Sequence, residues 1–180
     1  RWVLLTGASG YVGGRLLRVL TDRGERVRCL ARFPENLRGR VPAGVEVVAG
    51  DVTDRESLDR ALAGVDTAYY LVHSMTSADS NFDLLEGESA RNFSSYIRTT
   101  TAKQIIYLGG LANADHLSKH LRSRKNVETV LNESGKPLTV LRAGIIIGSG
   151  SASFEIIRDI VEKLPIMVTP KWLNTKIQPI

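Results

Sequence analysis

Hydrophobic and polar residues follow two different periods along this chain, which predicts strands and helices in alternation. The apolar residues 3–5 form a run that is short enough to be a buried strand. After a glycine-rich stretch, Val12, Leu16, Val19 and Leu20 recur at i, i+4, i+7 and i+8, the spacing of one face of a helix. The chain is therefore expected to open with a strand, a glycine turn and an amphipathic helix.

The same alternation continues along the rest of the chain. Further strands are predicted at 25–32, 45–49, 66–72, 105–108 and 138–141. Helices are predicted at 53–64, 81–99, 119–134 and 154–164, with polar loops at 33–44 and 109–118. Strands that alternate with helices typically form a parallel sheet. The sequence thus predicts an α/β fold of the Rossmann type, with a doubly wound parallel sheet, helices on both faces and three α/β/α layers in one domain over 1–180.

Local signals add detail to three of these helices. Thr53 and Glu56 have the spacing of a capping box, which predicts that Thr53 caps the helix at 53–64. The buried stripe of the helix at 81–99 is expected to consist of Leu85, Ser89, Phe93 and Ile97. The residues expected to face inward from the helix at 119–134 are Val127, Val130 and Leu131.

The glycines of the first turn have the G-x-x-G-x-x-G spacing of a phosphate-binding loop. We expect Gly7 to make the turn, Gly10 to let a pyrophosphate approach the backbone, and Gly13 to let helix and strand pack closely. The free N–H groups at the start of the helix would face the anion. The predicted cofactor-binding residues of this loop are Gly7, Ala8, Ser9, Gly10, Tyr11, Val12 and Gly13.

The end of the second predicted strand indicates which dinucleotide is bound. NAD-binding folds usually place an acidic residue there, where it accepts hydrogen bonds from the adenosine ribose. The stretch 29–33 contains no carboxylate and carries Arg32 instead. A guanidinium offers a charge and a planar fork to a 2′-phosphate, so NADP is the predicted cofactor, with NAD as the alternative. The other interpretation of Arg32 is an ordinary strand-end arginine in water.

Two further strand ends would complete the cofactor site. Asp51 and Val52 follow the third strand, where Asp51 could accept from the adenine amino group while the main chain holds the ring edge. Alternatively, Asp51 only helps to cap the next helix. Leu71, Val72 and His73 follow the fourth strand and would pass beneath the ribose and nicotinamide. His73 could line that pocket or be a surface group.

Composition and charge narrow the class of partner. The chain has 180 residues, 43% hydrophobic and 24% charged, as in ordinary globular domains. Its net charge of +5 is dispersed, and the densest basic cluster, at 122–125, has no interleaved aromatics, so we expect a small-molecule substrate and no nucleic-acid partner. No apolar run reaches the length of a membrane span, and no signal-peptide pattern is found, so no membrane partner is expected. The single cysteine, Cys29, is expected to be a buried thiol in a reducing cytoplasm.

Three motifs together resemble the short-chain dehydrogenase/reductase superfamily. They are the glycine loop at 6–13, Gly-Asp-Val-Thr-Asp at 50–54, and Leu-Arg-Ala-Gly at 141–144 with Gly148, where Ala143 replaces the usual proline. The resemblance covers nearly the whole chain and is strongest to the extended and atypical branch, the NmrA-like NAD(P)H-binding bacterial proteins. It implies a Rossmann domain followed by a smaller, variable substrate-binding part. Since the chain begins without Met and stops at residue 180, we expect a piece of a longer protein that lacks most of that part.

The chain departs from the superfamily at the catalytic positions. Usual members carry Y-x-x-x-K on the fifth helix, and the resemblance places His120 and Arg124 in these two slots. The serine that usually follows the fifth strand is replaced within 107–111. An imidazole can exchange a proton near neutral pH, and Arg124 would be a fixed cation one turn away that binds ribose hydroxyls or phosphate. His120 and Arg124 are therefore the candidate catalytic residues, or else they form polar helix surface over the cofactor; no metal site is predicted.

Two functions remain open at this point. One is an NADPH-dependent oxidoreductase that reduces a carbonyl or quinone, with the proton from His120 or from a residue beyond 180. The other is a catalytically inactive module that senses NADP(H), which the missing tyrosine, lysine and serine favour. An epimerase or dehydratase of nucleotide sugars shares the fold but depends on that tyrosine. Basic residues on the helices that pair between subunits in this superfamily predict a monomer or weak homodimer; they are Arg91, Arg98, Arg122 and Lys125.

Overall fold

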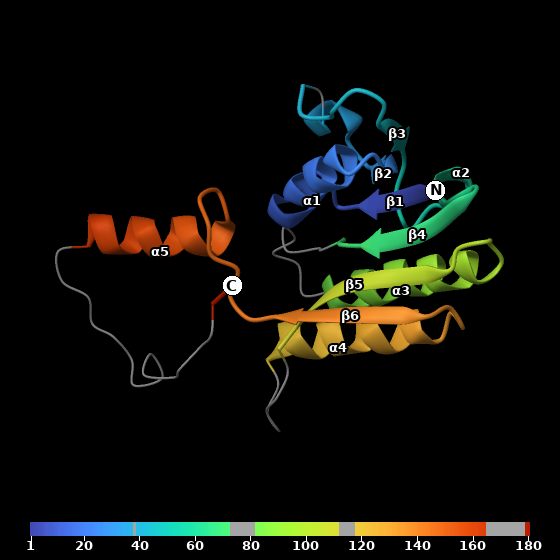
Figure 1. The fold of residues 1–180 in the computed structure, drawn as a ribbon. Coiled ribbons are helices and arrows are strands. Elements are labelled where there is room, and N and C mark those ends of the chain that lie inside the picture. Colours follow the sequence, from blue (N-terminus) through green and yellow to red (C-terminus); the bar gives the residue numbers. More distant parts are fainter. Residues whose placement is uncertain (38, 73–81, 112–117, 165–178) are drawn as a thin grey trace. The chain divides into compact units, whose positions relative to one another are not determined.

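The computed structural model describes residues 1–37, 39–72, 82–111, 118–164 and 179–180. Within them, six strands form one parallel sheet in the order β3-β2-β1-β4-β5-β6 (Figure 1). The strands are β1 (Trp2–Thr6), β2 (Arg26–Ala31), β3 (Glu46–Ala49), β4 (Val65–Tyr70), β5 (Gln104–Gly110) and β6 (Leu138–Ala143). The helices are α1 (Tyr11–Asp22), the 3-10 helix η1 (Pro34–Leu37), α2 (Arg55–Leu62), α3 (Phe82–Arg98), α4 (Lys119–Asn132) and α5 (Ala152–Lys163). This strand order is that of a doubly wound Rossmann sheet, which confirms the predicted fold class.

Helices cover both faces of the sheet, because successive strand residues point to opposite sides. On one face, Leu17 and Leu20 of α1 belong to a core with Val3, Leu5 and Cys29 of the strands. On the other face, α2, α3 and α4 enclose a larger core that includes Leu4, Ala68, Ile105, Leu58, Phe93 and Leu131. The thiol of Cys29 is fully buried, as the sequence predicts.

Two helices bury a face that differs from the predicted one. Val19 of α1 is 46% exposed, and Leu17 is buried instead. Leu85 of α3 is 44% exposed, and the neighbouring Glu86 is buried in its place. One step along a helix turns the side chain by about 100°, so an amphipathic pattern locates a broad stripe but leaves its edge undetermined. The remaining residues of the expected stripes on α3 and α4 are buried as predicted; they are Ser89, Phe93, Ile97, Val127, Val130 and Leu131.

The N-cap of α2 is also one residue away from its predicted position. The carboxylate of Asp54, rather than the hydroxyl of Thr53, accepts the N–H of Ser57, at 3.1 Å. The hydroxyl of Thr53 instead donates to Oδ1 of Asp51, at 2.9 Å. The hydrogen bonds from Ser57 hold the pKa of the Asp54 carboxyl below its usual value.

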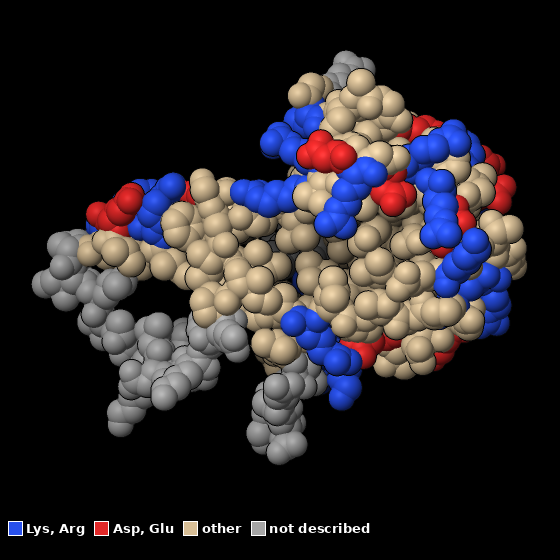
Figure 2. Space-filling view, in the orientation of Figure 1, with Lys and Arg blue, Asp and Glu red and all other residues tan. Residues whose placement is uncertain are grey.

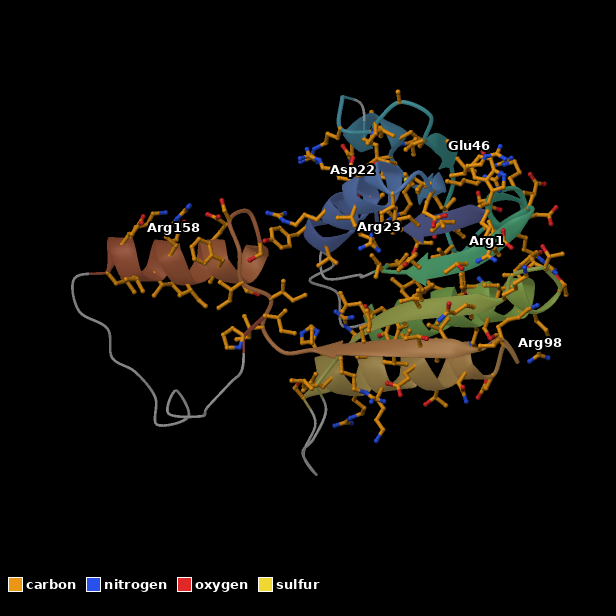
Figure 3. The ribbon with its side chains drawn as sticks, viewed as in Figure 1. Arg1, Asp22, Arg23, Glu46, Arg98 and Arg158 are labelled. Carbon is orange, nitrogen blue, oxygen red and sulfur yellow. The ribbon has the colours of Figure 1, made fainter. Side chains whose placement is uncertain are left out.

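A buried arginine joins β2 to β3 and to the end of α2. Nε of Arg28 donates to Oε2 of Glu46 at 2.9 Å, and Nη1 donates to the carbonyl oxygens of Ala61 and Ala63 at 3.0 and 2.7 Å. Cations are favourable at the C-terminal end of a helix, where carbonyl groups remain unpaired. Glu46, labelled in Figure 3, lies at the first residue of β3. This contact anchors the edge strand that carries residues 50–53 beyond its far end.

The chain forms two compact units, Arg1–Leu141 and Arg142–Ile180. In the second unit, the Ser151 hydroxyl accepts from the N–H of Phe154 at 3.3 Å and so caps α5. The large apolar side chains of α5 that are exposed are Ile156, Ile157, Ile160 and Val161. None of the described helices is long and apolar enough to cross a membrane. On the face shown in Figure 2, basic side chains are interspersed with acidic ones.

Candidate cofactor-binding site

The site lies at the carboxyl ends of β1 and β4, where the winding direction of the sheet reverses. In open α/β sheets, ligands bind in the crevice outside this point. The hydroxyl of Thr6, the last residue of β1, donates to the carbonyl oxygen of Tyr69 and accepts from the N–H of Leu71, both at 3.0 Å. Thr6 is fully buried, so one side chain fixes the two strand ends to each other.

Two glycines of the first loop stand where no side chain fits. Gly7 has φ of +72°, and a Cβ there would lie 2.6 Å from the carbonyl oxygen of Leu71. A Cβ at Gly13 would lie 2.1 Å from the carbonyl oxygen of Gly7. The turn and the close packing expected of these two positions are therefore present. Gly10 bonds back to Gly7, with its N–H 3.0 Å from the carbonyl oxygen.

The start of α1 offers main-chain N–H groups to an anion. Gly10 is the N-cap residue and has no side chain that could occupy these donors. Tyr11 opens the helix, and the guanidinium of Arg15 lies over its ring, 3.7 Å from the centroid. Ala8 is buried, Ser9 is exposed, and Tyr11 and Val12 are half-buried. A main-chain cradle lined by glycines fits the pyrophosphate of a dinucleotide.

At the adenosine end, Arg32 and Asp51 lie together. They follow β2 and β3, which are paired in register with Ala31 opposite Ala49. Nε of Arg32 is 3.6 Å from Oδ2 of Asp51, and the Arg32 side chain is 60% exposed. The two side chains therefore form an ion pair, whereas the sequence analysis had considered each residue separately. The exposed guanidinium can still face a phosphate.

The residues around Asp51 are tightly packed. A Cβ at Gly50 would lie 1.9 Å from Oγ of Ser57, so glycine is required for α2 to approach the end of β3. The side chain of Val52 is buried in the core beneath α2 and α3. Any contact of Val52 with an adenine ring would therefore have to come from its main chain.

The end of β4 supplies Leu71 and Val72, both half-buried. The side chain of Leu71 packs against the core beneath α1, whereas that of Val72 packs against the core on the opposite face. The two residues thus continue the alternation of the strand into the crevice. His73, the third residue predicted here, lies outside the described residues.

The two catalytic candidates share one face of α4 but have different surroundings. His120 is exposed, in the first turn of the helix. Arg124 is half-buried, and its Nη1 donates to the carbonyl oxygen of Leu108 in β5, at 2.9 Å. Burial lowers the pKa of the Arg124 guanidinium to about 10, so it remains a cation at neutral pH. Arg124 thus holds α4 to β5, a role that the sequence does not reveal.

A buried polar contact below this face was also missed. The hydroxyl of Ser123 donates to Oε2 of Glu86 at 2.6 Å, and both residues are about 6% exposed. The hydroxyl of Tyr107 donates to the carbonyl oxygen of Arg124 at 3.3 Å. Burial, with the negative charge of Glu86 nearby, raises the pKa of Tyr107 well above its ordinary value. Tyr107 is thus a neutral hydrogen-bond donor that supports α4.

Among the described residues, no group of three or more His, Cys, Asp or Glu side chains could hold a metal ion. The described parts of the site are a main-chain anion cradle at the start of α1 and an exposed arginine at the end of β2.

The model of a family described as NAD(P)H-binding matches residues 7–161. This chain belongs to that NAD(P)H-binding family. The match includes the glycine loop, Arg32, Asp51 and the α4 face, so the cofactor class predicted from the sequence is confirmed.

Relatives of this NAD(P)H-binding chain include reductases. It is 36% identical over 140 residues to (4-alkanoyl-5-oxo-2,5-dihydrofuran-3-yl)methyl phosphate reductase of Streptomyces griseus, a match that covers 78% of this chain and 46% of that protein. The chain thus spans about half the length of this curated relative.

Two solved structures show the same fold. The Bordetella bronchiseptica enzyme WbmH in complex with NAD+ superposes with a TM-score of 0.75 at 17% identity, over 90% of this chain and 63% of that one. The NADPH-dependent quinone oxidoreductase QOR2 of Escherichia coli, complexed with NADPH, superposes with a TM-score of 0.69 at 22% identity, over 81% of this chain and 50% of that one. The two superpositions show that this chain shares the fold of these two proteins.

Proposed function

We propose that this chain is the cofactor-binding part of an NADPH-dependent reductase whose acceptor is a carbonyl compound or a quinone. The observation that carries the proposal is the glycine cradle at the reversal point of the sheet, with an exposed arginine and no carboxylate at the end of β2. The names of the Streptomyces and Escherichia proteins support a reductase. The 2′-phosphate preference is supported by Arg32 alone.

Each part of the site would have a defined task. The N–H groups at the start of α1 would bind the pyrophosphate, and Arg32 would bind the 2′-phosphate. Leu71 and Val72 would lie beneath the ribose next to the nicotinamide. Bound NADPH supplies the hydride that reduces the acceptor carbon. His120 would donate the proton that the acceptor oxygen takes up, since its imidazole is exposed on the α4 face that Arg124 holds to β5.

A specific observation supports the second candidate, a module that senses NADP(H) without turnover. The guanidinium of Arg124 bonds to the carbonyl oxygen of Leu108, so this cation is committed to the scaffold rather than presented to a ribose. A chain with an intact cofactor cradle and no assembled proton donor would bind the dinucleotide and pass on only a change in stability or contacts.

Titration with NADPH and NADH, followed by nicotinamide fluorescence, tests both candidates on this chain. Selective NADPH binding, together with loss of nicotinamide absorbance when an aldehyde or quinone is added, supports the reductase. His120→Gln should then lower kcat with little change in KM, because glutamine cannot donate the proton. NADPH binding without oxidation by any acceptor supports the sensor. If neither dinucleotide binds, both candidates are wrong.

A further inference from the structure

The negative charge of Asp51 is held in a fixed place beside Arg32. Oδ1 of Asp51 accepts from the N–H of Thr53 at 2.8 Å and from its hydroxyl at 2.9 Å. With Oδ1 fixed in this way, Oδ2 is directed toward Arg32, 3.6 Å from Nε. The carboxylate therefore keeps its position whether or not the arginine side chain moves.

The distance between Arg32 and Asp51 determines how the pair acts on a bound phosphate. At 3.6 Å, the pair is an ion pair without a short hydrogen bond, and the Arg32 side chain is 60% exposed. Such a pair orients a guanidinium only weakly, because an exposed ion pair contributes little free energy. Its electrostatic effect is larger: the carboxylate offsets part of the positive potential that Arg32 presents. A phosphate that bound the free edge of the guanidinium would also lie close to this carboxylate and be repelled by it.

We propose that Asp51 limits the preference for a 2′-phosphorylated cofactor that Arg32 creates, so that the site discriminates less strongly between NADPH and NADH. The inference rests on the proposed function in one respect, that Arg32 faces the adenosine ribose. A 2′-hydroxyl carries no charge and is not repelled by Asp51, whereas a 2′-phosphate is a dianion near neutral pH. Asp51 thus acts against one cofactor and not the other, and it does so through charge.

The test replaces the charge and keeps the shape. Asp51→Asn retains an oxygen that can accept from Thr53. Any adenine contact is common to NADPH and NADH, so the ratio of their Kd values isolates the effect at the 2′ position. Asp59→Asn, on the exposed surface of α2, makes the same change in net charge and is the matched control. Adenosine 2′,5′-bisphosphate and 5′-AMP provide the same comparison without the nicotinamide.

Asp51→Asn should raise the NADPH-over-NADH affinity ratio about 3- to 10-fold at low salt, and the gain should shrink as salt screens the charge. Asp59→Asn should leave the ratio within about twofold, since its charge is remote and exposed. An unchanged or lowered ratio in Asp51→Asn, with thermal unfolding and NADH binding preserved, would overturn the inference. Failure of the proposed function would look different, because the unsubstituted chain would then bind neither dinucleotide.

Discussion

Gly13 and Gly7 are in direct main-chain contact: a Cβ atom at Gly13 would lie 2.1 Å from the carbonyl oxygen of Gly7. The first turn of α1 therefore rests on the loop after β1, and the N–H groups of that turn are fixed relative to the strand. Gly14, the next residue along, has no such restriction, because a Cβ there would lie 3.4 Å from the carbonyl oxygen of Ala8, an ordinary contact. Adjacent glycines of one helix thus have opposite requirements.

Gly13→Ala should destabilise the fold by about 1–3 kcal/mol, the usual cost of overpacking, and should weaken NADPH binding at least tenfold. Gly14→Ala should be neutral, or stabilising by about 0.5–1 kcal/mol, because alanine favours the helix. Urea unfolding and fluorescence titration measure the two effects on both variants. Equal behaviour of the two alanine variants would contradict the packing described for Gly13.

Arg32→Ala should lower the NADPH-over-NADH preference by about 10- to 100-fold. The change removes charge-assisted hydrogen bonds to the 2′-phosphate, which contribute about 1.5–3 kcal/mol. Arg18→Ala, at an exposed position two turns into α1, removes the same charge and should leave the preference unchanged. Paired titrations in which Arg32→Ala kept the original ratio would show that another group reads the 2′ position.

Burial raises the pKa of the Cys29 thiol from 9.0 to about 12. The folded chain therefore holds the neutral thiol over a pH range in which the unfolded chain ionises. This contribution to stability is fully present below about pH 9 and is lost as the pH rises toward 12.

Comparison with Cys29→Ala isolates the titration of this thiol from that of lysines and tyrosines. The difference in free energy of unfolding between the two chains should be constant up to about pH 8 and then shift in favour of the variant. Urea unfolding at a series of pH values measures it. If the free energies of unfolding of the two chains differed by the same amount at every pH up to 11, the thiol would not titrate on unfolding.

Ser123→Ala should destabilise the chain by about 1.5–3 kcal/mol, the value of a hydrogen bond to a charged group, since it removes the 2.6 Å bond to the buried Glu86. Ser95→Ala is the matched control on α3. Its hydroxyl donates to the carbonyl oxygen of Asn92 on the exposed face, and its loss should cost less than about 0.5 kcal/mol. Thermal unfolding measures the loss of stability in both variants. Equal losses would show that burial of the contact with Glu86 does not matter.

The order of strands and helices could be predicted from the sequence, because the strands are short apolar runs separated by clear turn motifs. The glycine spacing at 7, 10 and 13 predicted both the turn after β1 and the close packing of α1 against it. Helix rotation was less predictable, as Leu17 and Glu86 show, because the stripe that is finally buried depends on which partner the helix meets. The α2 cap was predicted one residue too early, because Asp54, like Thr53, has a side-chain oxygen that can accept at a helix start.

The candidate site was predictable only in its local parts. Arg32 and Asp51 were each identified from their own strand ends, but their ion pair depends on the register of β2 and β3. The hydrogen bond from Arg124 to the carbonyl oxygen of Leu108 joins α4 to β5. The separation of these two residues along the chain does not predict that they meet. Contacts between residues distant in sequence can be predicted only once the fold is known. The chemistry of a loop, by contrast, can be recognised from its consecutive residues.

The hydroxyl of Thr6 acts as a clasp at the point where the sheet reverses its winding. It donates to the carbonyl oxygen of Tyr69 and accepts from the N–H of Leu71. The consequence is mechanical. β1 and β4 cannot spread as a ligand enters unless this clasp opens, and opening it would leave buried polar groups without partners at a cost of about 1–3 kcal/mol each. A dinucleotide that binds over these two strand ends would therefore meet a rigid floor, already in the shape that it needs.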